Sequence, residues 1–275
     1  MTNDHRTQTR EPWGQVVITD ATTPSSRPLL RRLVDQDISV IVIKDLLGDK
    51  LLHKGLELIL AHYEKKTASS YHNGTLTTIG PYLARYLSDL DYYFGHAGTI
   101  DEVFSNTDFD VRRITQQRLR SLFGLDRLEA EREPDGRRYA DSIVRVHGDG
   151  VANPLHNDNI MRDAARSGLK LANLKHQLSC VVCMQECDRG GELVTYRKRW
   201  APEDEKFKVP GGLGYDSGVI VGAERDVFRP HQGDVYLINP TSYHEIERVS
   251  GKDRVTLSFF IGFYDDDLQH AVLWS

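Results

Sequence analysis

The 275-residue chain has few cysteines, no long hydrophobic run and no excess of basic residues. No stretch approaches the roughly 18 consecutive apolar residues that are needed to span a bilayer. The first residues, MTNDHRTQTREPWG, lack the apolar segment of a secretory signal. We therefore expect a cytoplasmic protein without a membrane partner.

The charge balance argues against a general polyanion binder. The chain carries 35 Lys and Arg residues against 40 Asp and Glu residues, a formal net charge of -5. A nucleic-acid-binding surface has to be basic, because affinity comes largely from counterion release. We expect no nucleic-acid partner, although the local clustering of basic residues is compatible with one small anionic ligand.

The three cysteines lie close together, as Cys180, Cys183 and Cys187. Their spacing resembles a reversed iron–sulfur ligand pattern. The surrounding residues LSCVVCMQ, however, have the pattern of a buried strand, and residues three apart on a strand point to opposite faces. We interpret these cysteines as small buried hydrophobic residues of a reduced compartment.

The sequence pattern changes near residue 138. Before it, we expect a strand at 37–47 and helices at 48–66, 82–96 and 111–125. After it, short β-rich runs alternate with Gly, Pro and Asp turns, which indicates a barrel or a sandwich. No linker or repeat appears, so we predict one domain over 1–275 that is mainly β with N-terminal helices (α+β). Its parts are a disordered start (1–13), a helical support layer with N-terminal strands (14–137) and a catalytic β core (138–265).

The segment NPLHNDNIMRD (153–163) places His156 and Asp158 two positions apart behind an Asn-Pro turn. Alone, the pair reads as an exposed polar turn. If both residues leave the end of the strand SIVRVHG (142–148), they can face one point, and His244 supplies a third ligand at the mouth of a later strand. Two histidines and a carboxylate leave half of an octahedron open, which is typical of non-haem Fe(II) oxygenases.

Ten residues after His244, Arg254 opens the strand RVTLSFFIGFY. Period-two alternation places Arg254, Thr256 and Ser258 on one face. A guanidinium that points into an apolar interior is costly without an anion, and a carboxylate fits its fork. The alternative is a surface ion pair of Arg254 with Asp253 or Glu247.

Four segments occur in an order that resembles the Fe(II)/2-oxoglutarate-dependent dioxygenases. They are LHND (155–158), RGGELVTY (189–196), GDVYLINPTSYHEIERV (233–249) and GKDRVTLSFF (251–260). The resemblance covers residues 138–265. The overall layout looks most like the bacterial small-molecule group of halogenases and N-acyl-amino-acid hydroxylases.

The resemblance implies a double-stranded β-helix (jelly-roll) barrel that uses Fe(II), 2-oxoglutarate and O₂. His156, Asp158 and His244 would hold the iron. Arg254, helped by Thr256, would bind the C5 carboxylate of 2-oxoglutarate. Arg145 and His147, eleven and nine positions ahead of His156, stand where related enzymes also contact the cosubstrate, although Asn and Tyr are commoner there.

The resemblance also implies oxidation of an unactivated C–H bond, with release of succinate and CO₂. Related halogenases carry Gly or Ala in place of the carboxylate ligand, so Asp158 favours hydroxylation. The expected substrate is a small molecule, anionic or amino-acid-like, contacted by Arg162 and Phe259. The alternatives are a metal-binding cupin that binds or isomerises a ligand without oxygenase chemistry, and a protein or nucleic-acid demethylase. Arg254 counts against the first, and the acidic balance counts against the second.

Overall fold

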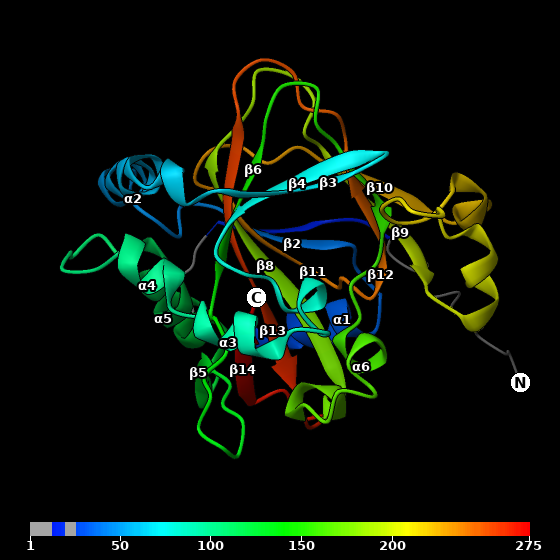
Figure 1. Ribbon diagram of the computed structural model, residues 1–275, viewed down its shortest axis with the longest axis horizontal. Coiled ribbons are helices and arrows are strands. Elements are labelled where there is room, and N and C mark those ends of the chain that lie inside the picture. The colour runs from blue at the N-terminus through cyan, green and yellow to red at the C-terminus, as the bar shows by residue number, and fades with distance from the viewer. Residues whose placement is uncertain (1–12, 20–25) are drawn as a thin grey trace, which may run out of the picture.

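The computed structural model describes residues 13–19 and 26–275 of the chain. They form a mainly β structure with helices, in which a large and a small sheet face each other (Figure 1). This confirms the mainly β prediction with N-terminal helices. The predicted disorder of 1–13 falls outside the described residues except for Trp13, which is buried.

The large sheet follows the order β1-β2-β11-β8-β13-β6-β4-β3, and β14 joins it by pairing with β13 and β5. Its long central strands are β8 (His176–Gln185) and β13 (Arg254–Phe263). The other members are β1 (Val16–Ile18), β2 (Val40–Ile43), β3 (Thr67–Tyr71), β4 (Gly74–Ile79), β5 (Arg127–Ala130), β6 (Ile143–His147), β11 (Val235–Ile238) and β14 (His270–Trp274).

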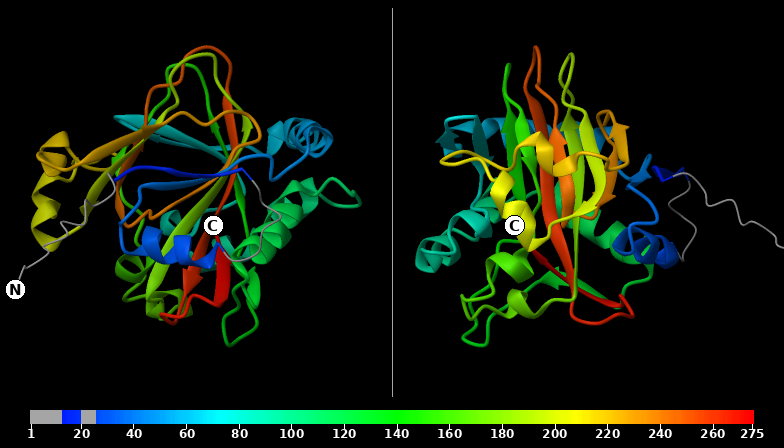
Figure 2. Two further views of the ribbon diagram at one scale, coloured as in Figure 1. Left: turned by 180° about the vertical axis from the view of Figure 1, so that it is seen from behind. Right: turned by 90° about the vertical axis from the view of Figure 1, so that its right-hand side faces the viewer.

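The small sheet follows the order β10-β9-β12-β7 and lies opposite the large sheet. Its strands are β7 (Asn153–His156), β9 (Leu193–Arg199), β10 (Arg225–Phe228) and β12 (Ser242–Ile246). Figure 2 shows the long strands of the large sheet from behind and from the side, with helices of the first half outside them.

The helices include α2 (Asp49–Ala61) and α5 (Val111–Phe123), which lie with α4 on the side of the large sheet away from β9 and β12 (Figure 1). Both match predicted helices. The start of α5 is capped by Asp110, whose carboxylate accepts from the Arg113 N–H, and it ends at Gly124 with a left-handed φ of 58°. The remaining helices are α1 (Arg27–Val34), α3 (Leu90–Gly95), α4 (Thr99–Val103) and α6 (Ile160–Asp163), with short 3-10 turns η1 (Tyr63–Lys65), η2 (Leu83–Arg85), η3 (Lys170–Asn173), η4 (Pro202–Phe207) and η5 (Ser217–Ile220).

The prediction of one helix over 82–96 is wrong. The segment contains the short turn η2 and, separately, α3. Asp89 accepts a hydrogen bond from the Tyr92 N–H and so starts a new helix inside the predicted one. An aspartate that caps a new N-terminus competes with continuing the preceding helix.

Strand β13 separates the hydrophobic core from the space between the sheets. Val255, Leu257 and Phe259 belong to the main core cluster. Residues of the opposite parity, Arg254, Thr256 and Ser258, are buried polar groups that line a cavity between the sheets. The alternation of one strand therefore supplies both the helix-packed core and the wall of the site.

The cysteines are free and buried. Cys180 packs in the main core, and burial raises its pKa. Burial also raises the pKa of Cys183 to about 12, against the lowering effect of nearby Arg254. Neither environment favours a thiolate, and thiolate is the form that ligates metal. In the described part of the chain, no helix is long and apolar enough to cross a membrane.

Candidate metal centre and adjoining cavities

His156 ends β7 in the small sheet, and not the strand SIVRVHG as we expected from the sequence. That strand is β6, which lies in the large sheet. The short β7 pairs antiparallel with β12, so His156 stands directly opposite His244. Asp158 follows two residues later, where its backbone N–H donates to the Pro240 carbonyl at 2.8 Å. The backbone thus brings the three predicted ligands to one end of the small sheet.

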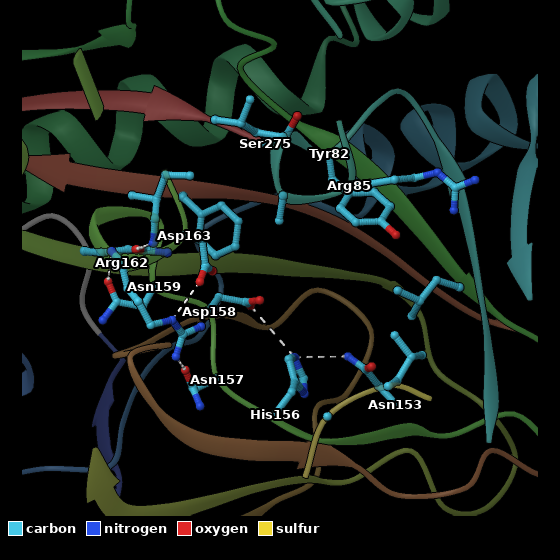
Figure 3. A pocket seen from close by; sticks show the side chains of 18 of the residues that line it. Tyr82, Arg85, Asn153, His156, Asn157, Asp158, Asn159, Arg162, Asp163 and Ser275 are labelled. Carbon is cyan, nitrogen blue, oxygen red and sulfur yellow. Dashed lines mark hydrogen bonds and ion pairs between the residues drawn. The ribbon is translucent and has the colours of Figure 1, made fainter. Parts of the chain in front are cut away.

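The ligand atoms of these three residues converge. They lie within 4.8 Å of one another, and no second group of this kind is found in residues 13–19 and 26–275. The Asp158 Oδ2 lies 3.8 Å from the His156 Nε2 and 3.9 Å from the His244 Nε2. Figure 3 shows Asp158 and His156 pointing toward each other at the edge of the cavity.

Both imidazoles are oriented by the backbone. The His156 Nδ1 lies 2.7 Å from the Pro154 carbonyl, and the His244 Nδ1 lies 2.9 Å from the Ser242 carbonyl. Because a carbonyl only accepts, each Nδ1 carries the proton and each Nε2 presents a lone pair toward Asp158. Such a carbonyl contact on the distal nitrogen is a common feature of metal-binding histidines. The donor set therefore fits a divalent iron ion.

The electrostatics keep His244 and Asp158 in their ligating forms. Burial lowers the pKa of His244 to about 3, with the adjacent His156 acting in the same direction. Burial would raise the pKa of the Asp158 carboxyl, but His156, His244 and nearby arginines outweigh it and lower the pKa. Neutral imidazoles and an ionised carboxylate are the forms that bind iron.

Arg254 lies beside this triad on the inner face of the large sheet. Its side chain is buried, and its Nη2 donates to the Tyr236 hydroxyl at 2.8 Å. It is not found in an ion pair with Asp253 or Glu247. A cavity of about 60 Å³ is lined by Arg254, Thr256, His147 and the triad, among others. A buried guanidinium without a carboxylate partner fits an anionic ligand there.

His147 is the direct cross-strand partner of Arg254, and Arg145 is the partner of Thr256. Both ring nitrogens of His147 are buried without a hydrogen-bond partner. Burial and the adjacent Arg254 and Arg145 hold the His147 pKa well below its usual range, so the ring is neutral. A neutral imidazole facing the cavity offers one donor and one acceptor.

A larger cavity of about 350 Å³ opens next to the small one. The two share six residues, namely Arg145, Asn153, His156, Asp158, Phe260 and Ser275. In Figure 3, Tyr82 and Arg85 lie across the cavity from His156 and Asn153. Its other walls include Tyr71, Leu76, Leu83, Leu213, Tyr215 and Trp274.

The two candidate substrate residues differ in their placement. Arg162 lines the large cavity, but its Nε donates to Asp163 at 2.6 Å and its Nη1 donates to the Asn157 side chain at 2.7 Å. Phe259 packs in the main core and only borders the small cavity, whereas the next residue, Phe260, lines both. Because side chains alternate along β13, the aromatic side chain that lines both cavities is Phe260 and not the predicted Phe259.

Two further site residues escaped the sequence analysis. Tyr236 accepts from Arg254, and the Asn153 amide lies 3.4 Å from the His156 Nε2. Tyr236 lies eight residues before His244, at alternate parity to the core residues Val235 and Leu237. Its polar group in an otherwise apolar strand was a usable signal. Asn153 was hidden by its appearance as an ordinary Asn-Pro turn.

Comparison with known proteins places the chain in a family. The model of the carrier-protein-independent halogenase WelO5 family matches residues 16–275. "Leucinostatins biosynthesis cluster protein S" of Purpureocillium lilacinum is 29% identical over 152 residues, which are 52% of this chain. That match spans 60% of the relative's length.

Solved structures share the fold. A crystal structure of an N-substituted L-amino acid dioxygenase from Burkholderia ambifaria matches with a TM-score of 0.63 and 17% identity, over 90% of this chain and 91% of the other. The non-haem alpha-ketoglutarate-dependent carbocyclase SnoK from nogalamycin biosynthesis matches with a TM-score of 0.54 and 14% identity, over 91% and 88%. The family match confirms the resemblance to the Fe(II)/2-oxoglutarate-dependent oxygenases, and the solved structures share their fold. The chain belongs to the WelO5 family, within the enzymes that use Fe(II), 2-oxoglutarate and O₂.

Proposed function

We propose that this protein hydroxylates an unactivated C–H bond of a small molecule. His156, Asp158 and His244 would hold the iron, and Arg254 with Thr256 would bind the C5 carboxylate of 2-oxoglutarate. His147 would complete the cosubstrate pocket, and Arg145 lies where this pocket meets the larger cavity. The observation that carries this proposal is the convergence of the His156 and His244 Nε2 atoms on the Asp158 carboxylate. Beside them lies the buried Arg254, which has no carboxylate partner among the described residues.

When bound, iron, 2-oxoglutarate and O₂ would supply the chemistry that oxidises a C–H bond, coupled to decarboxylation of the cosubstrate to succinate. The protein orients and encloses these reactants. Backbone carbonyls fix both imidazoles, and the Tyr236 hydroxyl fixes one end of the Arg254 guanidinium. Phe260 and Trp274, whose stacked rings have centroids 5.4 Å apart, form an apolar wall that excludes water from the large cavity.

The family name raises a second candidate, halogenation. A halogenase needs a free coordination position for the halide, and related halogenases obtain it with Gly or Ala at the carboxylate position. In this chain that position is Asp158, whose ionised carboxylate faces both histidines. The carboxylate would occupy the position that a halide requires, so hydroxylation is the function we favour.

The substrate and the architecture are part of the same proposal. The two facing sheets support a double-stranded β-helix, with residues 138–265 as the catalytic core of one domain. The shared walls of the two cavities support the binding of a small molecule in the larger one. Arg162 and the aromatic pair Phe259 and Phe260 are the proposed contacts.

The test uses the full chain loaded anaerobically with Fe(II) and 2-oxoglutarate. A weak visible charge-transfer band is expected in the wild type. It should be absent when Arg254→Gln is loaded with Fe(II) and the same concentration of 2-oxoglutarate. Small carboxylic acids, N-acyl-amino acids and their amides are then supplied with O₂ and sodium chloride. Succinate with a product heavier by one oxygen supports hydroxylation. A chlorinated product would overturn it in favour of the family's named activity, and the absence of a band in the wild type would overturn the iron site itself.

A further inference from the structure

The large cavity is lined by four cationic side chains, Arg85, Arg145, Arg162 and Lys208. Two of them already have carboxylate partners. Arg162 pairs with Asp163 at 2.6 Å, and Lys208 pairs with Glu205 at 3.5 Å. The others differ in what satisfies them.

Arg85 donates to the Ser69 hydroxyl, and its guanidinium lies 5.6 Å from the centroid of the Tyr86 ring. It stands on the wall opposite His156 (Figure 3). The Arg145 side chain, in contrast, makes no hydrogen bond or ion pair with any residue that the structure describes, and its Nε is buried without a partner. It is the cation whose hydrogen-bonding capacity is least used.

Arg145 also occupies a distinctive position. It lies in β6 between Thr78 of β4 and Thr256 of β13, its direct cross-strand partners. It lines both cavities, whereas Arg254 and His147 line only the small one. Arg145 therefore stands between the cosubstrate pocket and the substrate cavity.

The charges of the loaded site leave Arg145 uncompensated. If Arg254 takes the C5 carboxylate of 2-oxoglutarate, the charges of iron(II), Asp158, doubly charged 2-oxoglutarate and Arg254 cancel. One guanidinium then remains half-buried beside the reacting centre with no anion. Because an unpaired buried charge is costly, a further anion is expected from the only component left, the substrate.

Resting on the proposed function, we infer that Arg145 binds a carboxylate of the substrate, which is a carboxylic acid with an apolar body. The free Nε and a neighbouring Nη provide a side-on, bidentate fork that matches a carboxylate. The apolar body faces Leu76, Leu83, Leu213, Phe260 and Trp274 on the other walls. Fixing the acid at Arg145 holds a nearby C–H bond next to the triad.

The test compares acids with their primary amides, which have nearly the same shape and no charge. The probes are N-acetyl-L-leucine, N-acetyl-L-phenylalanine, N-benzoyl-L-leucine and 3-phenylpropanoate. Each acid and each amide is titrated anaerobically into the holoenzyme at saturating 2-oxoglutarate, and Kd is read from the perturbed charge-transfer band. In the wild type, at least one acid should bind about 10- to 100-fold more tightly than its amide.

Arg145→Gln should bring the ratio of the amide Kd to the acid Kd to near one, while the Kd of 2-oxoglutarate changes less than about 3-fold. Arg145→Lys should give an intermediate ratio. Arg85→Gln and Lys208→Gln are the matched controls from the same cavity and should keep the ratio. Thermal unfolding of each variant checks that it is folded.

Three results would overturn the inference. In the first, the wild type binds no acid more tightly than its amide. In the second, Arg145→Gln keeps the preference for the acid but loses affinity for 2-oxoglutarate, and in the third a control variant, and not Arg145→Gln, abolishes the preference. In each case a normal charge-transfer band in the wild type leaves the proposed oxygenase function intact. Loss of that band in the wild type is the separate failure of the proposed function.

Discussion

His156 and His244 are direct partners across strands β7 and β12, and their ring centroids lie 4.2 Å apart. The two residues are far apart along the chain, and the pairing of two short strands alone brings them together. Each ring is oriented through its Nδ1 by the carbonyl two residues earlier in its own strand. The backbone of the two paired strands therefore sets the relative position of the two imidazoles.

Replacement of Asp158 by Ala should abolish hydroxylation. Loss of an outer-shell partner costs about 10- to 100-fold in metal affinity, and loss of a direct ligand should cost at least about 100-fold. Competition of Fe(II) with a coloured chelator measures the affinity, and succinate release measures turnover. Asp163→Asn, a carboxylate of the same cavity that pairs with Arg162, should retain Fe(II) affinity. Full turnover in Asp158→Ala would remove Asp158 from the triad.

Arg254 and Tyr236 should contribute unequally to cosubstrate binding. Removing one partner of a buried charge pair costs about 2–5 kcal/mol, so Arg254→Gln should raise the Kd of 2-oxoglutarate about 30-fold or more. Tyr236→Phe loses one hydrogen bond, worth about 0.5–1.5 kcal/mol, and should raise it roughly 2- to 10-fold. Anaerobic titration of the charge-transfer band gives both values. Equal effects of the two variants, or none for Arg254→Gln, would contradict this assignment.

The glycine pair of the β8–β9 connection should affect the site and the fold separately. A Cβ on Gly191 would lie 2.7 Å from the Cys187 Sγ and 3.1 Å from the Arg254 Cδ. A Cβ on Gly190 would lie 1.9 Å from the Arg248 carbonyl oxygen and contact no part of Arg254. Both glycines have a positive φ, near 72°, that an L side chain strains.

We therefore expect Gly191→Ala to weaken 2-oxoglutarate binding by displacing Arg254, beyond its cost in stability. Gly190→Ala is the matched control, and should lower Tm without a comparable change in the Kd of 2-oxoglutarate. Both quantities are measured on the same preparations. If the two variants lose cosubstrate affinity in proportion to Tm, the effect is on folding alone.

The sequence was sufficient to predict that His156, Asp158 and His244 converge, because their chemistry leaves a local mark. An H-x-D pair, a later histidine and an arginine at alternate parity to Val255 and Leu257 are all visible without coordinates. The origin of His156 was missed because β7 is four residues long, interrupted by Pro154, and gains its strand conformation only by pairing with β12. The break before α3 was not predicted because the helical periodicity of the sequence continues through Asp89, although the helix itself does not. Whether the Arg145 side chain has hydrogen-bond partners depends on neighbours from several strands, so no pattern along the sequence predicts it.

Acid should destabilise the protein partly through Glu131. This buried carboxylate accepts from the Lys170 Nζ at 2.8 Å, the Arg132 N–H at 2.7 Å and the Tyr264 hydroxyl at 2.9 Å. Burial would raise its pKa, but these donors outweigh burial and hold the pKa below the ordinary 4.5. A depressed folded-state pKa stabilises the fold above the unfolded value, and that contribution is lost as pH falls through the folded value.

Glu131→Gln should therefore cost about 1.5–3 kcal/mol at pH 7, and the difference from wild type should shrink as pH falls below 4.5. Urea unfolding at a series of pH values measures it. The exposed neighbour Glu129, paired with Arg127 at the surface, supplies the control, because Glu129→Gln should cost less than about 1 kcal/mol. A cost for Glu131→Gln that does not vary with pH would show that packing, and not ionisation, is responsible.

Two segments that both line the large cavity are joined by a pair of hydrogen bonds. The Asn73 side chain, at the tip of the β3–β4 hairpin, donates to the Leu213 carbonyl at 2.8 Å and accepts from the Leu213 N–H at 2.7 Å. Tyr71 and Leu76 line the cavity from the hairpin, and Leu213 and Tyr215 line it from the other segment. Asn73→Ala removes both hydrogen bonds, each worth about 0.5–1.5 kcal/mol.

Hydrogen exchange of residues 209–215 should therefore accelerate about 5- to 100-fold in Asn73→Ala, because local opening becomes less costly by the sum of the two bonds. Binding of 2-oxoglutarate, on the inner side of the site, should be unchanged. Ser70→Ala, at an exposed position of the same hairpin, is the control and should leave the exchange at wild-type rates. Unaltered exchange in Asn73→Ala would mean that packing of Leu213 and Tyr215, and not the Asn73 contact, holds the two segments together over the cavity.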